Sequence, residues 1–469
     1  MTPVIGFLYS ILLFLESIFA TNSYIEGVQG FIYSLDPVKA QSDAEKTVAH
    51  LLNRSLFKYD SENKLTGDLA KSYEISDDGL TYTVTLSPDN YWHDGRAITA
   101  DDVIYTASQY QHLRDIGTDK IGDFSVRFSL PNKYSPFLSV LTFPIVNYIN
   151  SDTRSGDFYL VKIKRTSEGI KELTLFTTNT NYKINKIVFK FYSKESDLFI
   201  AYKLGEIDGF LSPSNFSWVG LSKKEISLLG RYFVLHFNTA REVFSNKDNR
   251  KLAVESVNLE KMQKQFIKNP NIKTEGVISG SLYTKKDLTE AVFNPNATPL
   301  KTPLKIKAIV PDLAEMNGMI SYIFKSFESV GFNIEVSKLS STGVQEAISL
   351  PRDYDIFILG EEVGRDPDRY VFWHSTQKDP PGLNLSSLSN LRVDKALEKG
   401  REETAFETRQ GDYNIFQSAV NEESPAIYLY HPGLYYYLSD KIVSSNFENL
   451  YYPYERFDNL VSWKMGNEL

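Results

Sequence analysis

The densest group of side chains that could do chemistry lies in "GEEVGRDPDRYVFWH", residues 360–374. It places Glu361, Glu362, Asp366 and Asp368 directly after "DIFIL", an apolar run that predicts a buried strand. Carboxylates at a strand end could serve as acid and base in a hydrolase, or could bind the ammonium group of a ligand. The third interpretation is a solvated loop, the commonest fate of acidic runs.

A second candidate is "YWHDGRAITADDVIYT", residues 91–106, where His93 stands beside Asp94. A catalytic or metal role would need partners at triad or ligand spacing, and none lies nearby in the sequence. The chain has six histidines, no cysteine, and no nucleophile elbow, phosphate loop, dinucleotide fingerprint or HExxH motif. We therefore expect no metal ion and no cofactor.

The same stretch carries the signals of a helix start. Thr99 occupies an N-cap position, and Asp101 and Asp102 fall in the first turn, where the helix dipole favours negative charge. Ile98 and Val103 stand at the positions of a hydrophobic staple. The motif predicts a turn followed by a capped helix, with His93 in a structural role.

Length and composition describe a large folded protein. A chain of 469 residues is longer than one that ordinarily folds around a single hydrophobic core, so two or three domains are expected. Acidic residues outnumber basic ones, 59 to 51, and the net charge of -8 provides no basic field for nucleic acid. We expect a monomer that does not bind nucleic acid.

The N-terminus begins with an apolar run from Val4 to Leu15, followed by Glu16 and by Ala20. The run suits the apolar region of a secretory signal, with Ala20 before a cleavage point. An uncleaved anchor is the alternative, although a carboxylate in the hydrocarbon layer is costly. Residues 1–22 are therefore predicted to be a signal peptide or an N-terminal anchor, and the protein to be extracytoplasmic.

Alternating element types predict an α/β fold. Around the Asp78-Gly79 turn, alternating apolar residues predict a β-hairpin with one buried face. Helical spacing predicts a helix within 46–60. Further strands are expected at 185–193, 231–239, 304–312, 333–339, 353–360 and 425–432, and further helices at 195–205, 316–332 and 412–424.

The order of these segments resembles one family, the extracytoplasmic solute-binding proteins of oligopeptide and dipeptide ABC transporters. The resemblance runs from about Tyr24 to Trp463. It is carried by "YIEGVQGFIYSLDP", "LAKSYEISDDGLTYTVTLSPDNYWHDGRAITADDV", "SPFLSVLTFPIV", "KLGEIDGF", "RYFVLHFNTAR", "GRDPDRYVFWHS", "PGLNLSSLSNLRVDKAL" and "RFDNLVSW".

The resemblance implies a two-lobed periplasmic-binding-protein fold of type II, in the large peptide-binding class with an extra small domain. The implied domains are a discontinuous hinge lobe at 23–40, 146–236 and 440–469, a small domain at 41–145 and a second lobe at 237–439. The lobes would close over a peptide or similar oligomer and deliver it to the transmembrane subunits of an ABC importer. No enzymatic activity is implied.

The ligand-binding residues expected from the strand ends and the resemblance are Gln29, Gly30, Phe31, Asn238, Glu361, Glu362, Arg365, Asp366, Trp373 and Asn384. Carboxylates would meet an ammonium group, Arg365 a carboxylate, and Asn238 the main chain of the ligand. Relatives that bind free peptides hold the α-amine with an aspartate a few residues before the "DP" dipeptide. Val363 occupies that position here, so Glu362, Asp366 or Asp368 would have to replace it.

Two alternatives of other classes remain open. One is an envelope hydrolase that uses Glu361 or Glu362 with Asp366 as acid and base. The other is a ligand-sensing receptor with the same fold. The family's usual lipid-bearing cysteine is absent, which favours a signal peptide or a protein anchor.

Overall fold

The computed structural model describes residues 22–217, 221–267, 271–285, 292–444 and 449–466. The chain forms two compact units, Met1–Ile226 with Leu434–Leu469, and Ser227–Gly433. The predicted signal or anchor at 1–22 lies, apart from its last residue, outside the described residues. No helix within them is long and apolar enough to cross a membrane.

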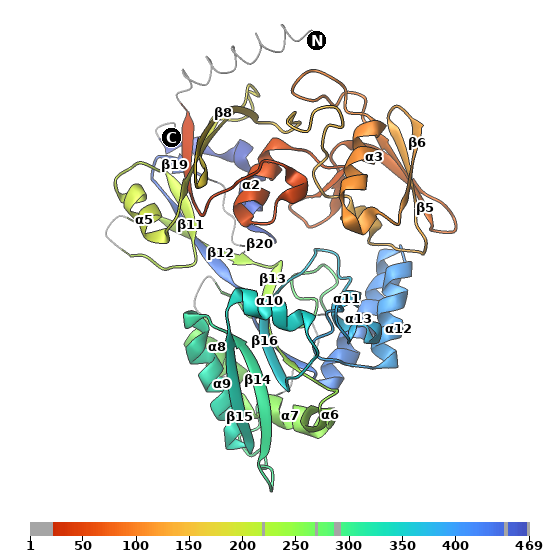
Figure 1. Cartoon of the computed structure of the whole chain (residues 1–469), viewed down its shortest axis with the longest axis vertical. Helices are drawn as coiled ribbons and strands as arrows, with labels where there is room; N and C mark the ends of the chain where they lie inside the picture. The colour runs from red at the N-terminus through yellow and green to blue at the C-terminus, as the bar shows by residue number, and fades with distance from the viewer. Residues whose placement is uncertain (1–21, 218–220, 268–270, 286–291, 445–448, 467–469) are drawn as a thin grey trace. The chain divides into compact units, whose positions relative to one another are not determined.

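The first unit is built on an eight-stranded sheet of order β20-β12-β18-β11-β1-β10-β9-β8 (Figure 1). Strand β1 is central because it pairs in parallel with both β10 and β11. The strands are β1 Ser23–Gln29, β8 Tyr159–Thr166, β9 Gly169–Phe176, β10 Lys186–Tyr192, β11 Gly209–Ser212, β12 Lys223–Leu228, β18 Gly433–Leu438 and β20 Asn449–Leu450. Helix α5 (Glu195–Lys203) packs against this sheet through Leu198 and Ala201.

A smaller four-stranded sheet, of order β4-β5-β7-β6, belongs to the same unit. Its strands are β4 Ala70–Ile75, β5 Thr81–Leu86, β6 Gly117–Gly122 and β7 Ser125–Ser129. The predicted hairpin is confirmed, since β4 and β5 pair antiparallel across the Asp78-Gly79 turn and the side chains of β5 alternate between buried and half-buried. Its own core runs from Leu56 to Ile145, and the separate small domain at 41–145 stays a prediction.

The helix predicted within 46–60 is wrong in its second half. Helix α2 covers Asp43–Leu52 and ends because the backbone extends at Asn53, whose amide donates to the carbonyl oxygen of Ala49 at 2.9 Å. Leu56 is fully buried, but it lies beyond the helix. The next residues form β2 (Phe57–Tyr59), which pairs with β3 (Leu65–Gly67). The apolar spacing therefore predicted correctly that Leu56 is buried, but it did not predict correctly that the helix extends to this residue.

The helix start predicted in 91–106 is confirmed. Helix α3 spans Ala100–Gln109 with Thr99 as its N-cap. The buried Asp102 carboxylate accepts from the backbone N–H groups of Thr99 and Tyr148 and from the indole N–H of Trp92, at 2.9, 3.0 and 3.1 Å. His93 is structural, with Nε2 2.7 Å from the carbonyl oxygen of Gly156.

A buried ion pair joins the two ends of the first unit. Glu26 on β1 and Arg456 on the short helix Pro453–Phe457 are each almost fully buried, and Arg456 Nη2 lies 2.9 Å from Glu26 Oε1. The hydroxyl groups of Tyr24 and Tyr436 donate to the other oxygen of Glu26. Burial, and then the Glu26 charge, raise the pKa of Tyr24 well above its usual value, so its hydroxyl stays a donor.

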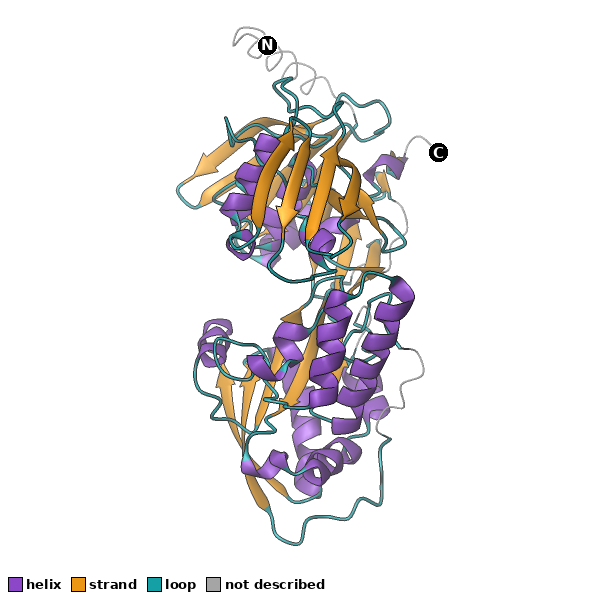
Figure 2. Ribbon diagram, turned by 90° about the vertical axis from the view of Figure 1, so that its right-hand side faces the viewer, coloured by secondary structure: helices purple, strands orange, loops and turns teal. Residues whose placement is uncertain are grey.

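The second unit is a five-stranded sheet of order β15-β14-β16-β13-β17 with helices on both faces (Figures 1 and 2). The strands are β13 Arg231–Phe237, β14 Leu304–Pro311, β15 Phe332–Leu339, β16 Ile356–Glu362 and β17 Ala426–Tyr430, which confirms the strands predicted there. The helices are α6 Glu242–Ser245, α7 Lys247–Ser256, α8 Leu259–Phe266, α9 Asn317–Ser329, α10 Ser341–Ser349, α11 Tyr370–Trp373, α12 Leu391–Glu402 and α13 Phe406–Glu423. The helix predicted at 412–424 thus begins earlier, at Phe406.

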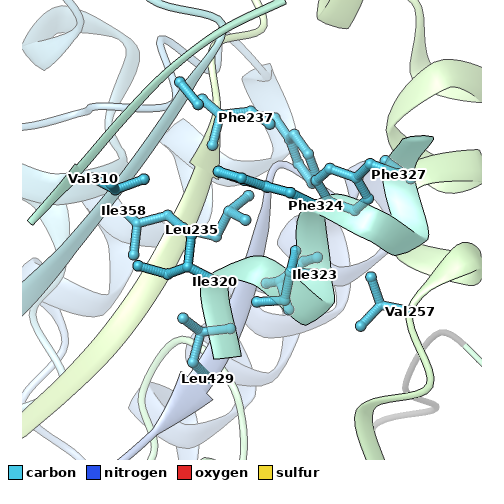
Figure 3. Close-up of a cluster of buried hydrophobic side chains, with 14 of the residues drawn as sticks. Leu235, Phe237, Val257, Val310, Ile320, Ile323, Phe324, Phe327, Ile358 and Leu429 are labelled. Atoms are coloured by element: carbon cyan, nitrogen blue, oxygen red, sulfur yellow. The ribbon is translucent and has the colours of Figure 1, made fainter. Parts of the chain in front are cut away.

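The alternation of side chains along β13 divides the unit into an apolar face and a mixed one. Leu235 and Phe237 point into the main core, where they meet Ile320, Ile323 and other residues of α9 (Figure 3). Tyr232, Val234 and His236 belong to the opposite face of the strand, because successive side chains point to opposite sides of a sheet. This second face holds the polar groups described below.

We expect Glu26→Gln to lower the free energy of unfolding by about 3–5 kcal/mol, because it leaves the Arg456 charge buried without its counter-ion. Urea denaturation followed by tryptophan fluorescence measures the change. The matched control is Glu62→Gln, which breaks an exposed pair with Lys64 and should leave stability close to wild type. Equal effects of the two variants would contradict the assigned role.

A second prediction concerns His50 on α2, whose Nε2 lies 2.6 Å from Asp458 Oδ1. Burial lowers the pKa of His50, but the charge and hydrogen bond of Asp458 outweigh it, so the net shift is upward from 6.5. A raised native pKa gives stability that is present below about pH 6.5 and is lost as the pH rises through the native value. We therefore expect His50→Gln to destabilise the protein more at pH 5.5 than at pH 8.5.

Denaturation curves at both pH values test this, with Asp458→Asn as the control. That variant should remove most of the extra stability at pH 5.5, because the counter-ion is gone. A His50→Gln effect that is constant with pH, or larger at pH 8.5, would exclude the ion pair as its cause.

Candidate functional site

The acidic residues lie where β16 ends in the second unit. Glu361 and Glu362 are the last residues of β16 and stand opposite Tyr232 and Arg231 of β13. The chain then turns through Gly364 to Asp368 and enters α11 at Tyr370. We call residues 361–369 the acidic loop.

Glu361 is buried and bound to a histidine. Its Oε1 lies 2.8 Å from Nε2 of His236, and Nδ1 of His236 lies 2.8 Å from the hydroxyl oxygen of Ser386. Ser386 in turn donates to the carbonyl oxygen of Pro425. Glu361 and His236 are 5% and 0% exposed, so neither is open to a ligand in solution.

The other three carboxylates of the acidic loop each meet an arginine. Glu362 Oε2 lies 2.8 Å from Nη2 of Arg231. Asp368 Oδ2 lies 2.9 Å from Nε of Arg401. Both oxygens of Asp366 are engaged, at 2.6 and 2.7 Å from the two terminal nitrogens of Arg409. This two-pronged geometry is the strong form of an arginine–carboxylate pair.

Arg369 gives the acidic loop a buried cation. It is 1% exposed, and its Nη1 donates to the carbonyl oxygen of Asp366 at 2.9 Å. The charges of Glu361 and Arg369 both act on the hydroxyl groups of Tyr232 and Tyr428. Burial, and then the Glu361 charge, raise the pKa of each hydroxyl well above its usual value, and Arg369 acts in the opposite direction.

Three predicted binding residues lie wholly inside the second unit. Asn238, Trp373 and Asn384 are each 0% exposed. The Asn238 amide donates to the carbonyl oxygens of Arg352 and Tyr354, and the Asn384 amide to those of Trp373, His374 and Leu388. The two asparagine amides thus bridge neighbouring loops, and Trp373 packs in the apolar cluster with Leu388 and Val393, while a binding role for the three residues stays a prediction.

The three predicted residues of the first unit lie at the carboxyl end of β1, where Gln29 is the last residue of the strand. Gln29 is exposed, and Gly30 has a φ of 90°, a conformation that favours glycine although a side chain would have room there. Phe31 is half-buried, and Nζ of Lys171 lies 5.5 Å from its ring centre and 5.2 Å from that of Tyr192. An aromatic and cationic surface thus follows the first strand.

A cavity of about 90 Å³ lies elsewhere in the second unit. Its wall combines α8, the end of α13, residues 273–277 and β17, and none of the predicted binding residues lines it. Among the residues that the model describes, no cluster of histidines and acids could hold a metal ion.

Glu361, Glu362, Arg365 and Asp366 lie within six residues of one another in the acidic loop, and the carboxylates of the loop meet partners that were not predicted from the sequence. These partners are Arg231, His236, Arg401 and Arg409. Arg409 lies 43 residues beyond Asp366, and no local spacing links the two. Acid–base chemistry gains no support, because both oxygens of Asp366 are held by Arg409.

Comparisons with known proteins place this geometry in context. Residues 64–381 match the model of the bacterial extracellular solute-binding proteins, family 5 Middle. The glutathione-binding protein GsiB of Pectobacterium atrosepticum is 33% identical over 138 residues, but that match covers only 27% of each protein. The oligopeptide-binding protein AppA of Bacillus subtilis is 20% identical over 92% of this chain and 88% of its own length.

Solved structures share the fold over nearly the whole chain. CtaP of Listeria monocytogenes, described as an ABC transporter substrate binding protein, matches with a TM-score of 0.79 at 21% identity, covering 95% of this chain and 99% of that one. AppA of B. subtilis, solved with a nonapeptide, matches with a TM-score of 0.70 at 17% identity, covering 94% and 98%. The predicted fold class is confirmed.

We expect Asp366→Asn to lower the free energy of unfolding by about 3–5 kcal/mol, because Arg409 would keep a charge in a site that is 7% exposed. Chemical denaturation measures the loss. Asp353→Asn is the control, since that carboxylate is 68% exposed and its removal should leave stability close to wild type. A wild-type-like Asp366→Asn would show that the pair contributes little.

Proposed function

The chain belongs to family 5 of the bacterial extracellular solute-binding proteins, and we propose that the solute it binds is a peptide or a similar oligomeric molecule. The observation that carries the proposal is the match to AppA, which extends over most of both chains in sequence and in fold. AppA is an oligopeptide-binding protein and was solved with a nonapeptide. GsiB, similar over a shorter stretch, binds glutathione, which is itself a small peptide.

Delivery to the transmembrane subunits of an ABC importer is the second part of the proposal. CtaP, which shares the fold, is described as a substrate binding protein of such a transporter. In this proposal the protein acts as a monomer outside the cytoplasm, brought there or anchored by residues 1–22. Closure of the two lobes around the solute would create the form that the importer recognises.

The proposed contacts with the solute come from surfaces in each unit. In the first unit they are Gln29, Gly30 and Phe31, with the ring of Phe31 beside the Lys171 cation. Extended peptides present both apolar side chains and main-chain polar groups, which an aromatic surface beside a charge can meet together. In the second unit the half-buried Arg365 of the acidic loop is the proposed contact.

A ligand that binds only the folded protein stabilises it by about 2.7 kcal/mol at a concentration one hundred times its Kd. We therefore expect the melting temperature to rise with the concentration of peptides of two to nine residues. Native mass spectrometry of gently purified protein should show a co-purified peptide. Phe31→Ala should weaken the shift, whereas Tyr73→Ala, at an exposed tyrosine of the small sheet, should not.

The same samples decide between the classes of function. Peptide recovered intact after incubation supports a binding protein, and cleaved peptide would instead support the hydrolase. Stabilisation by sugars or metal complexes alone would refute the peptide assignment. Uptake of the bound solute that persists when the permease genes are deleted would remove the importer from the proposal.

A further inference from the structure

Helix α5 of the first unit carries apolar side chains on its outer side as well as on its inner side. Leu198 and Ala201 are buried and pack in the apolar cluster between the helix and the sheet. Ile200 and Leu204, four residues apart, are 54% and 68% exposed. Neighbouring exposed apolar side chains mark surfaces that meet another protein or a membrane. The outer side of α5 is therefore a candidate interaction surface.

The strands beside α5 carry lysines on the side of the sheet that the helix covers. Gly27 of β1 stands next to Lys190 of β10. Lys190 in turn pairs with Glu172 of β9, which pairs with Lys164 of β8. A side-chain carbon on Gly27 would lie 2.6 Å from a methyl carbon of Leu198, so this row of residues faces α5. Because side chains two residues apart on a strand share a face, the lysines on this side of the sheet are Lys162, Lys164, Lys186 and Lys190.

This side of the first unit has an excess of positive charge in an acidic chain. With Lys194 and Lys203 of α5 and its N-cap, it carries six lysines. The carboxylates beside them belong to Glu172, Glu195, Asp197 and Glu206. Glu172 is in an ion pair with a lysine at 2.7 Å, and Glu195 accepts from two serine hydroxyl groups. Six cations thus stand against four anions, although the chain as a whole has a net charge of -8.

The chain also enters the first unit beside these lysines. Strand β1 begins at Ser23, which stands next to Lys186. The carbonyl oxygen of Asn22 accepts from the backbone N–H groups of Asn185 and Lys186, at 3.1 and 3.4 Å. In the sequence the apolar run Val4–Leu15 ends a few residues before this point. An apolar run that enters a membrane would therefore bring this side of the unit within reach of the lipid headgroups.

We propose that the outer side of α5, with the lysines of the neighbouring strands, lies on a membrane surface that contains anionic lipids. We call this surface the α5 face. Its lysines meet the lipid phosphate groups, and Ile200 and Leu204 enter the headgroup region. Basic and apolar side chains on one surface hold proteins on such membranes, because apolar burial and electrostatic attraction add together. The proposal concerns where the protein lies and not which solute it binds, so it does not depend on the peptide assignment.

A fluorescent label on α5 tests the proposal, since the chain has no cysteine that would compete for it. The label is attached to Ser196→Cys, at an exposed position four residues before Ile200. The full-length labelled chain is mixed with phosphatidylcholine vesicles, with or without phosphatidylglycerol, whose headgroups carry a spin-label quencher. We expect the anionic vesicles to lower the emission by at least about twofold and the neutral vesicles to lower it much less.

The control label is attached to Glu62→Cys, on the turn between β2 and β3, where the wild-type side chain is 71% exposed. Its emission should stay close to the value without vesicles for both lipid mixtures. Equal quenching at positions 62 and 196 would show that no face of the protein is directed to the lipid and would overturn the proposal. Quenching at position 196 that does not depend on lipid charge would do the same.

The double variant Lys162→Gln and Lys194→Gln removes two exposed cations of the α5 face and should abolish most of the quenching at position 196. The matched control is Lys325→Gln with Lys395→Gln, which removes two exposed lysines from α9 and α12 of the second unit. It should quench like the wild type. Equal losses in the two double variants would overturn the proposal, and melting curves without lipid verify that each variant is folded.

The apolar part of the α5 face is tested by Ile200→Ser with Leu204→Ser. Both side chains are exposed, so the melting temperature should change little while the quenching at position 196 falls. Unchanged quenching would remove the two residues from the contact and overturn the proposed insertion. Emission that changes with protein concentration in the absence of vesicles would assign the α5 face to a second copy of the chain instead of a membrane.

Discussion

The buried ion pair between Glu26 and Arg456 is the constraint on which the first unit depends. The two residues lie 430 positions apart, one on the central strand of the eight-stranded sheet and the other in the last described turns. Neither charge has access to water, so each requires the other. The surface that follows β1, with Phe31 beside Lys171, is held by a strand that the far end of the chain keeps in place.

The second unit uses charge in another way. Its apolar face packs against α9 as an ordinary core, whereas the opposite face of β13 mixes apolar side chains such as Val234 with the buried His236, which lies 2.8 Å from Glu361. The acidic loop is held by ion pairs to β13, α12 and α13 and by the buried Val363, which packs in the apolar cluster of Tyr232 and Val234. Such pairs add little net stability compared with apolar groups, but they define the position of a loop, which is what recognition of a solute needs.

Local features of the fold were predictable from the sequence, and long-range ones were not. The hairpin at Asp78-Gly79 and the helix start at Thr99 follow from signals within a few residues. The prediction of a helix beyond Leu52 was wrong because Asn53 is the C-cap of α2, where its side-chain amide donates to the carbonyl oxygen of Ala49. The acidic loop was identified, but its pairing with Arg409 depends on the tertiary fold and leaves no trace in local spacing.

The two segments of the first unit are synthesised at different times, because the second unit lies between them in the sequence. The second unit, Ser227–Gly433, is inserted between the two segments of the first. At synthesis rates of about 5–20 residues per second, those roughly 200 residues separate the two segments by about 10–40 seconds. During that time the second unit can fold by itself, while Glu26 still lacks its counter-ion. The first unit becomes whole only with the last turns of the chain, so a truncated product would carry an unfinished sheet.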